Sequence, residues 1–282
     1  MAEADEPNLK PQEAFYKWLE IWTPMIERFK TFKWKGEDGE QMWHFLRRGV
    51  IVRQFEALQA IQHLIEGGRG NFGVVFLRPA FEELVWIEYL TKHIDIANEL
   101  IGRMANIEIA ANIKAQDDYV GRREMIEGGF TTELVKTLLD GDQWVQSRIR
   151  EIGTKLGWNM SRSLLPTMAY LAKQVDREKD YKFLYQGTSR YVHFSTQEIF
   201  RRIWGTKGDV TITSKNFNEY WEQFGISWGV RIFADLIIAC IDDFGEYADG
   251  LTESIGEIGQ LQAMFAGTIP IITLGELRGW RQ

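Results

Sequence analysis

From residue 40 to residue 66 the chain reads EQMWHFLRRGVIVRQFEALQAIQHLIE. Large apolar residues recur here every three or four positions, and this spacing places side chains on one face of an α-helix. They are Trp43, Leu46, Val50, Phe55, Leu58, Ile61 and Leu64. Two glycines follow at residues 67–68, and glycine favours the backbone angles that end a helix. This stretch therefore predicts a long amphipathic helix.

The same periodicity extends in both directions, whereas strict alternation of apolar and polar residues is nearly absent. We therefore predict an all-α, multi-helix bundle with an irregular C-terminal arm. Pro24 should kink the first helix or restart it, and a hydroxyl of Thr131 or Thr132 should cap a later one. A loop with a brief extended piece is expected at 205–213. Further helices are predicted over residues 11–33, 72–93, 95–127, 131–155, 161–175, 180–195 with Asp180 as its cap, 194–204 and 216–247.

The domain organisation is expected to be simple. We predict one structural domain with an N-terminal helical region at 1–36 that packs on the body, a main helical bundle at 37–266, and the C-terminal arm at 267–282. Eleven tryptophans support a packed interior because each removes a large apolar area from water. The apolar run Val230–Ile241 contains Arg231 and Asp235, so it is too short and too charged to predict a membrane span.

Composition excludes several classes of protein. The chain has 33 basic and 40 acidic residues among 282, which gives a formal net charge of −7 and argues against a general nucleic-acid coat protein. Its one cysteine, Cys240, excludes an internal disulfide framework and a Cys-rich zinc module, and its apolar setting predicts an inert core thiol. The acidic start of the chain lacks the features of a secretory signal, so we expect a cytoplasmic location.

One candidate site lies in the predicted helix at 72–93. Arg78, Glu82, Val85, Tyr89 and His93 are three or four residues apart and should share one side of that helix. An Arg and a Glu at this spacing can pair, and the pair is either structural or functional. In the structural alternative, the helix begins near residue 79 and its first acidic residues only complement the positive helix start.

A second candidate site repeats with a four-residue period. Tyr181, Tyr185, Ser189 and His193 should wind slowly around one side of a helix and meet the Arg78 face. The meeting would form a polar pocket in which a neutral histidine acts as acid, base or ligand. The alternative is a set of buried hydroxyls and one ring satisfied by backbone carbonyls.

Together these motifs resemble a known family. Arg78-x-x-x-Glu82, the stretch LLPTMA at 164–169, and the four-residue repeat that ends at His193 resemble a prokaryotic helical family, of the 5677 type, classed as a domain of unknown function. The resemblance covers roughly residues 43–204 and suggests distant kinship with HEPN-type helical proteins, which implies a role in defence or toxin systems. It points to five candidate catalytic residues, namely Arg78, Glu82, Tyr185, Ser189 and His193.

The chain departs from the HEPN ribonuclease pattern in one respect. Those enzymes place an Arg four to six residues before a catalytic His, and none of His44, His63, His93 or His193 has an Arg at that distance. The acidic net charge also disfavours RNA binding, although three local Arg pairs leave a small nucleic-acid contact as an alternative.

The remaining motifs give weaker evidence for a functional site. Residues 68–73 match the string G-x-G-x-x-G, but the preceding residues indicate a helix instead of the strand that a dinucleotide site requires. The four histidines are scattered, so we predict no metal site, with Glu82 and His193 as the alternative ligands from two distant helices. No cofactor is expected.

We therefore expect an interaction or sensing protein, associated with phage defence or stress, with a polar pocket between the Arg78 helix and the Tyr181 helix. The alternative is a divergent HEPN-like hydrolase or nuclease in which His193 is the acid or base and Arg78 stabilises a phosphate. Whether the chain is an enzyme stays open at this point. The expected partners are another protein or a second copy of the chain, with nucleic acid less favoured and no membrane.

Overall fold

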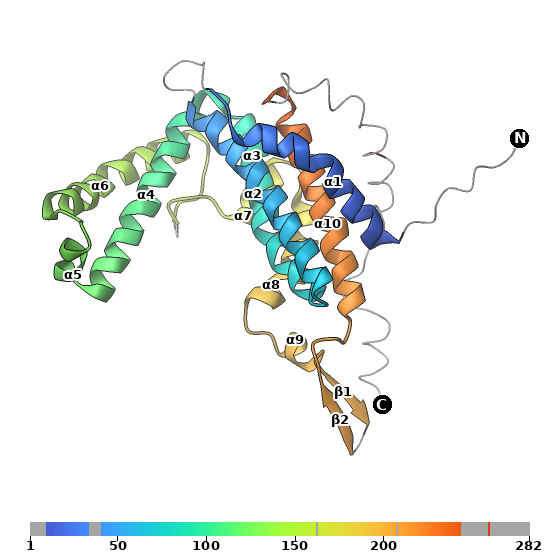
Figure 1. Cartoon of the computed structure of the whole chain (residues 1–282). Coiled ribbons are helices and arrows are strands. Elements are labelled where there is room, and N and C mark those ends of the chain that lie inside the picture. The colour runs from blue at the N-terminus through green and yellow to red at the C-terminus, as the bar shows by residue number, and fades with distance from the viewer. Residues whose placement is uncertain (1–9, 34–40, 162, 207, 244–258, 260–282) are drawn as a thin grey trace, which may run out of the picture. The chain divides into compact units, whose positions relative to one another are not determined.

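The computed structural model of the chain describes residues 10–33, 41–161, 163–206, 208–243 and 259. Within these ranges the protein is all-α apart from one small hairpin, which confirms the predicted class (Figure 1). The elements are α1 (Pro11–Lys30), α2 (Gln41–Glu66), the 3₁₀ helix η1 (Gly70–Phe76), α3 (Leu77–Thr91), α4 (Ile94–Val120), α5 (Arg122–Glu127), α6 (Thr132–Lys155), α7 (Met168–Gln174), α8 (Glu178–Val192), α9 (Thr196–Phe200), β1 (Ile203–Thr206), β2 (Asp209–Ile212) and α10 (Asn218–Ala239).

The described residues group into two compact units. The first unit takes its residues from 1–33, 47–88 and 175–282, and the second from 34–46 and 89–174, so that α2 and α3 contribute to both. The predicted division at residues 36 and 266 stays a prediction. The C-terminal arm at 267–282 lies outside the described residues. The helix predicted over 216–247 was too long, because α10 begins at Asn218 and ends at Ala239, with Cys240 as its C-cap.

Several predictions from the sequence are confirmed. Helix α2 has the predicted bounds within one residue, and α1 runs through Pro24 as one helix, so the proline does not restart it. The Oγ1 of Thr131 accepts a hydrogen bond from the backbone N–H of Leu134 at 3.1 Å, which is the predicted cap of α6. Cys240 is fully buried, and this burial raises the pKa of its thiol to about 11 despite the nearby Arg47.

Two predicted helices have different boundaries because of glycines. The segment from Gly70 to Phe76 is a 3₁₀ helix, so α3 begins at Leu77 instead of near residue 72. A Cβ at Gly70 would lie 2.0 Å from the Cγ of Glu222, so only glycine allows this approach of η1 to α10. The helix predicted over 95–127 is divided at Gly121, whose φ of +90° ends α4 before α5 begins.

Between residues 161 and 213 the predictions of helix were too long. Helix α7 covers only residues 168–174, and α8 starts at Glu178 with Arg177 as its N-cap, so Asp180 is not the cap. Of the helix predicted over 194–204, only α9 is helical, and the chain then enters β1.

Strands β1 and β2 pair antiparallel, with Ile203 opposite Ile212 and Gly205 opposite Val210. The extended piece predicted near 210–213 is therefore present, but its partner strand was missed. Ile203 and Trp204 favour strands, but a run of apolar residues as short as this fits a helix or a strand equally well. The sequence pattern alone therefore could not identify β1.

The first unit has an aromatic core in which Phe233 of α10 is central. Its ring centroid lies 5.6 Å from that of Trp18, 5.4 Å from that of Trp22 and 5.9 Å from that of Phe55. These three residues come from α1 and α2, so α10 packs against both helices (Figure 1). The tryptophans predicted as core residues therefore join elements from both ends of the chain.

The second unit contains α4 and α6, which lie side by side with α5 near their ends (Figure 1). Ile113, Met125 and Val135 form a small buried cluster there, with Phe130 packed against it. Among the described residues, no helix has the length and apolar character that a membrane crossing needs.

Candidate functional site

The N-terminal part of α3 presents a polar pair on one side and buries the other. Leu77, Phe81 and Leu84 are buried, and this fixes the orientation of the helix in the first unit. On the polar side, the Nε of Arg78 donates a hydrogen bond to the Oε1 of Glu82 at 3.0 Å. The pair predicted from the four-residue spacing is therefore formed.

Helix α8 is held by aromatic contacts with α10. The ring of Phe183 lies 6.0 Å from that of Phe224 and 5.5 Å from that of Trp228, and the ring of Tyr191 lies 5.0 Å from that of Trp221. These contacts use one side of α8. Tyr181 and Tyr185 lie one turn apart on the helix, with their ring centroids 5.2 Å from each other.

The two remote segments meet at Arg78. Its Nη1 lies 3.1 Å from the Nε2 of His193, and its guanidinium carbon lies 4.6 Å from the centroid of the Tyr185 ring, within the range of a cation–π contact. Since a guanidinium can only donate, Nε2 is the acceptor and the ring proton of the neutral histidine belongs on Nδ1. His193 itself is extended at the C-cap of α8, one residue beyond the helix.

This polar cluster is partly open to solvent. The side chains of Arg78 and Glu82 are 26% and 35% exposed, and His193 is exposed. Partial burial lowers the pKa of Arg78, but the hydrogen bond to Glu82 and the charges around it outweigh this effect, and the net shift is upward. Burial, together with Tyr185 and Glu82, raises the pKa of Tyr181, while the charge of Arg78 opposes the rise.

Ser189 lies one turn before His193 and differs from a satisfied core hydroxyl. Its Oγ is buried and has no hydrogen-bond partner among the described residues. The neighbouring hydroxyl of Thr188 behaves as the structural alternative requires, because it donates to the carbonyl of Leu184 at 2.7 Å. Buried hydroxyls without a partner are uncommon in folded proteins, so Ser189 is not explained by that alternative.

The rest of the predicted polar face on α3 lies apart from this cluster. The hydroxyl of Tyr89 accepts a hydrogen bond from the Nε1 of Trp158 at 2.7 Å, and the ring of His93 lies 4.7 Å from that of Tyr89. Val85 is fully buried. The prediction of one shared face therefore holds for Arg78 and Glu82 but is wrong for His93, which lies beyond the end of α3 as the N-cap of α4. Tyr89 is on α3, but its hydroxyl is used by Trp158.

An ionic network at the start of α8 was missed by the sequence analysis. Arg177 donates to both carboxylate oxygens of Glu88 at 2.7 and 2.6 Å and to Asp235 at 2.6 Å, and it lies 3.6 Å from Asp180. Its pKa is raised, because the hydrogen bonds and charges of Glu88 and Asp235 outweigh the opposing effect of burial. No local spacing could reveal these contacts, since Glu88 and Asp235 are far from Arg177 in the sequence.

The G-x-G-x-x-G string at 68–73 has a packing role. It follows helix α2 and overlaps the start of η1, so a helix precedes it instead of the strand of a dinucleotide site. Glu222, which is 5% exposed, lies against Gly70 and accepts hydrogen bonds from the Nε2 of Gln12 at 2.8 Å and from Asn218. A carboxylate in this position disfavours a bound phosphate.

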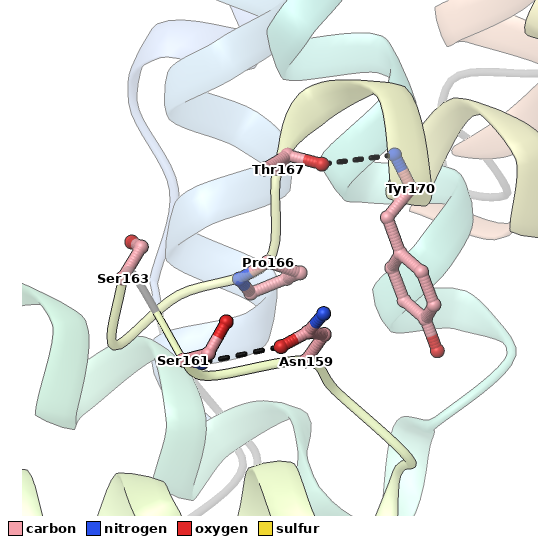
Figure 2. Close-up of a pocket in the computed structure, with 6 residues that line it drawn as sticks. All are labelled: Asn159, Ser161, Ser163, Pro166, Thr167 and Tyr170. Atoms are coloured by element: carbon pink, nitrogen blue, oxygen red, sulfur yellow. Dashed lines mark hydrogen bonds between the residues drawn. The ribbon is translucent and has the colours of Figure 1, made fainter.

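The second unit has a separate surface pocket of about 460 Å³, shown in Figure 2. The residues that line it are Asn159, Ser161, Ser163, Pro166, Thr167 and Tyr170. Asn159 accepts from the backbone of Ser161 and Thr167 from that of Tyr170, as the dashed lines of Figure 2 show. None of the six lining residues is Asp, Glu, His, Lys, Arg or Cys. Two of them stabilise the loop itself, and the hydroxyl of Tyr170 donates a hydrogen bond to the carbonyl of Leu156 at 3.2 Å.

A metal centre is not indicated by the described part of the chain. No three His, Cys, Asp or Glu side chains gather there in a way that could hold an ion. The carboxylate of Glu82 is used by Arg78 and the Nε2 of His193 accepts from the same guanidinium. Glu82 and His193, the alternative pair of metal ligands, therefore both accept hydrogen bonds from the guanidinium of Arg78.

The fold and the cluster define a class of protein: an all-α chain whose polar residues from two remote helices meet on a partly exposed surface. More particularly, the chain belongs to the Family of unknown function (DUF5677), whose model matches residues 44–210. That range includes α3, α8 and all five predicted site residues. Comparisons with curated proteins and with solved structures gave no match.

Proposed function

We propose that the protein is an interaction or sensing protein and that Arg78 and His193, with Glu82 and Tyr185 positioning the guanidinium, bind an anionic group of its partner or signal. One observation supports this most directly: a partly exposed guanidinium lies 3.1 Å from a histidine nitrogen. Glu82 and Tyr185 hold that guanidinium in place, and a planar set of N–H donors fixed in this way suits carboxylate and phosphate.

Inorganic phosphate is a suitable probe of this site. In ¹⁵N-labelled protein, the imidazole signals of His193, assigned by their loss in His193→Gln, should shift saturably when phosphate is added at constant ionic strength. Arg78→Gln should abolish the saturation, because the cation is removed. Arg123→Gln is the matched control, since Arg123 forms an equivalent pair with Glu127 four residues on but is 84% exposed.

Two outcomes of this titration would contradict the proposal. One is an unsaturable response in the wild-type protein, which would indicate ionic screening alone. The other is an unchanged titration curve in Arg78→Gln, which would show that phosphate binds elsewhere.

The contact between Arg78 and His193 also favours a second candidate function, a divergent HEPN-like hydrolase or nuclease. The sequence lacks an Arg at the usual distance before a His, but Arg78 from another helix lies within hydrogen-bond distance of His193. In this alternative, His193 is the acid or base and Arg78 stabilises the charge of a phosphate in the transition state.

Cleavage assays separate the two functions. The pure protein is incubated with labelled RNA and labelled single-stranded DNA, with and without divalent metals, beside His193→Ala. Cleavage that disappears in His193→Ala supports the nuclease. Intact substrates under all conditions support the interaction protein. A place in phage defence or stress response is part of the same proposal and is tested by the genes beside this one, among which a toxin, sensor or nuclease is expected.

A further inference from the structure

A group of large apolar side chains next to His193 is exposed to solvent. Among the described residues of 192–212 in the first unit, seven such side chains are exposed, namely Val192, Phe194, Ile199, Phe200, Trp204, Val210 and Ile212. We call all of them except Trp204, which lies on the other side of the hairpin, the apolar surface. Phe194 is 85% exposed and Ile212 is 73% exposed. Contiguous exposed apolar patches are rare on monomeric proteins and commonly mark interaction sites.

These residues belong to neighbouring elements. Helix α8 contacts α9, α9 contacts β1, and β1 pairs with β2. The register of the hairpin places Ile203, Ile212 and Val210 on the same side, because cross-strand partners share a face and successive residues alternate. His193 lies between Val192 and Phe194 in the chain, so the polar cluster adjoins the part of the apolar surface formed by these two residues.

The hairpin itself is incomplete as a sheet. It has two strands of four residues, and all four side chains of β2 are classed as exposed. A two-stranded ribbon of this size is marginally stable in water, and its open edges can pair with an added strand. An extended segment from another molecule would cover the apolar side chains and complete the sheet.

Charge indicates which kind of segment fits. Residues 185–217 contain five Lys or Arg and two Asp or Glu, whereas the whole chain contains 33 basic and 40 acidic residues. One of the two acids, Glu198, is paired with Arg201 at 2.5 Å. Without this pair, and without Lys207, which lies outside the described residues, the range keeps three basic side chains and one acidic side chain, namely Arg190, Arg202, Lys215 and Asp209. This excess of basic side chains is complementary to an acidic segment.

We propose that the apolar surface docks an extended, acidic and apolar segment of a partner protein, whose carboxylate is the anionic group bound by Arg78 and His193. This inference rests on the proposed function, because it names the partner of the same site. The apolar side chains of the docked segment would cover Phe194, Val210 and Ile212. Its acidic side chains would face the basic residues near His193.

The test uses a displayed library of random peptides of about a dozen residues, selected against the full chain. The enriched peptides should combine Asp or Glu with aromatic or aliphatic residues. Fluorescence anisotropy should then show that one enriched peptide binds Phe194→Ser/Ile212→Ser at least tenfold more weakly than wild type. The matched control is Ile109→Ser/Tyr119→Ser, which removes exposed apolar side chains from α4 and should bind like wild type.

Each result of the test has a defined meaning. Loss of peptide binding in Arg78→Gln but not in Phe194→Ser/Ile212→Ser would overturn the docking surface and leave the proposed function standing. Loss only in the apolar variant, with no phosphate response at His193, would overturn the proposed function and with it the acidic partner. Enrichment of basic peptides, or no enrichment, would also overturn the inference. If sedimentation shows a dimer that Phe194→Ser/Ile212→Ser converts to a monomer, the occupant is a second copy instead.

Discussion

The two ends of the α3–α8 pair are built differently. At one end, Arg177 before α8 contacts Glu88 near the end of α3, and at the other end Arg78 near the start of α3 contacts His193 just beyond α8. The two helices are therefore antiparallel and joined at both ends by an arginine. Arg177 is surrounded by three carboxylates and is 19% exposed, whereas Arg78 has one carboxylate, a phenol ring and an imidazole and is 26% exposed.

This difference separates a structural contact from a candidate site. The charge of Arg177 is more than balanced by its neighbours, so it has little to offer an external anion. Among the described residues, Arg78 has a single carboxylate partner, Glu82, and it lies beside the exposed His193. The comparison predicts that substitution of Arg177 reduces the stability of the fold. It predicts that substitution of Arg78 reduces anion binding more than it reduces stability.

The largest effect on stability is expected for Arg177→Gln. It leaves Glu88, Asp180 and Asp235 close together without their cation, and breaking a buried ion pair from one side costs several kcal/mol. Because these side chains are only partly buried, we expect a loss of about 2–4 kcal/mol in the free energy of unfolding, measured with urea. A loss below about 1 kcal/mol would remove the contrast between the two ends.

Arg78→Gln should have a smaller effect on stability and a complete effect on phosphate binding. The pair with Glu82 is about one-third exposed, and the lost cation–π and hydrogen-bond contacts together are worth about 1 kcal/mol. Urea unfolding and the His193 titration on the same samples check both parts. A loss as large as that of Arg177→Gln would mean that Arg78 is mainly structural.

The contribution of Tyr181, near Arg78, to the stability of the fold depends on pH in a defined direction. The pKa of Tyr181 is raised by burial, Tyr185 and Glu82, and lowered by the charge of Arg78. Its contribution to stability is present below the ordinary tyrosine value near 10 and is lost as the pH rises through the higher folded value. Arg78→Gln should therefore move the folded pKa further up, as measured by absorbance titration of the difference between each protein and its Tyr181→Phe variant. A downward shift of the Tyr181 pKa in Arg78→Gln would contradict the proximity of Arg78 to Tyr181.

The smallest effect is expected for Arg123→Gln. Arg123 and Glu127 repeat the spacing of Arg78 and Glu82, but they are 84% and 63% exposed. Exposed pairs at this spacing contribute about 0–0.5 kcal/mol, so stability should be unchanged within that range. A larger loss, measured by the same urea unfolding, would show that the four-residue pair matters without any tertiary contact.

The same two pairs show what the sequence could and could not reveal. Both pairs have the same four-residue spacing, so spacing alone does not distinguish them. The sequence did predict that Arg78 pairs with Glu82 and that the helix carrying Tyr185 and His193 meets Arg78. It could not predict that Tyr89 bonds Trp158, because the partner lies 69 residues away. The Arg177 network was missed for the same reason. Long helices such as α2 were predicted closely, whereas glycines at 70 and 121 and the short β1 changed boundaries through tertiary contacts and backbone angles.

A double-mutant cycle on Arg78 and His193 tests the central contact most directly. Urea unfolding of the wild type, Arg78→Gln, His193→Ala and the double variant at mildly alkaline pH gives the coupling free energy between the two side chains. The hydrogen bond between Nη1 and Nε2 predicts a coupling of about 0.5–1.5 kcal/mol. Losses that simply add, with no coupling, would mean that the two segments do not meet through these residues.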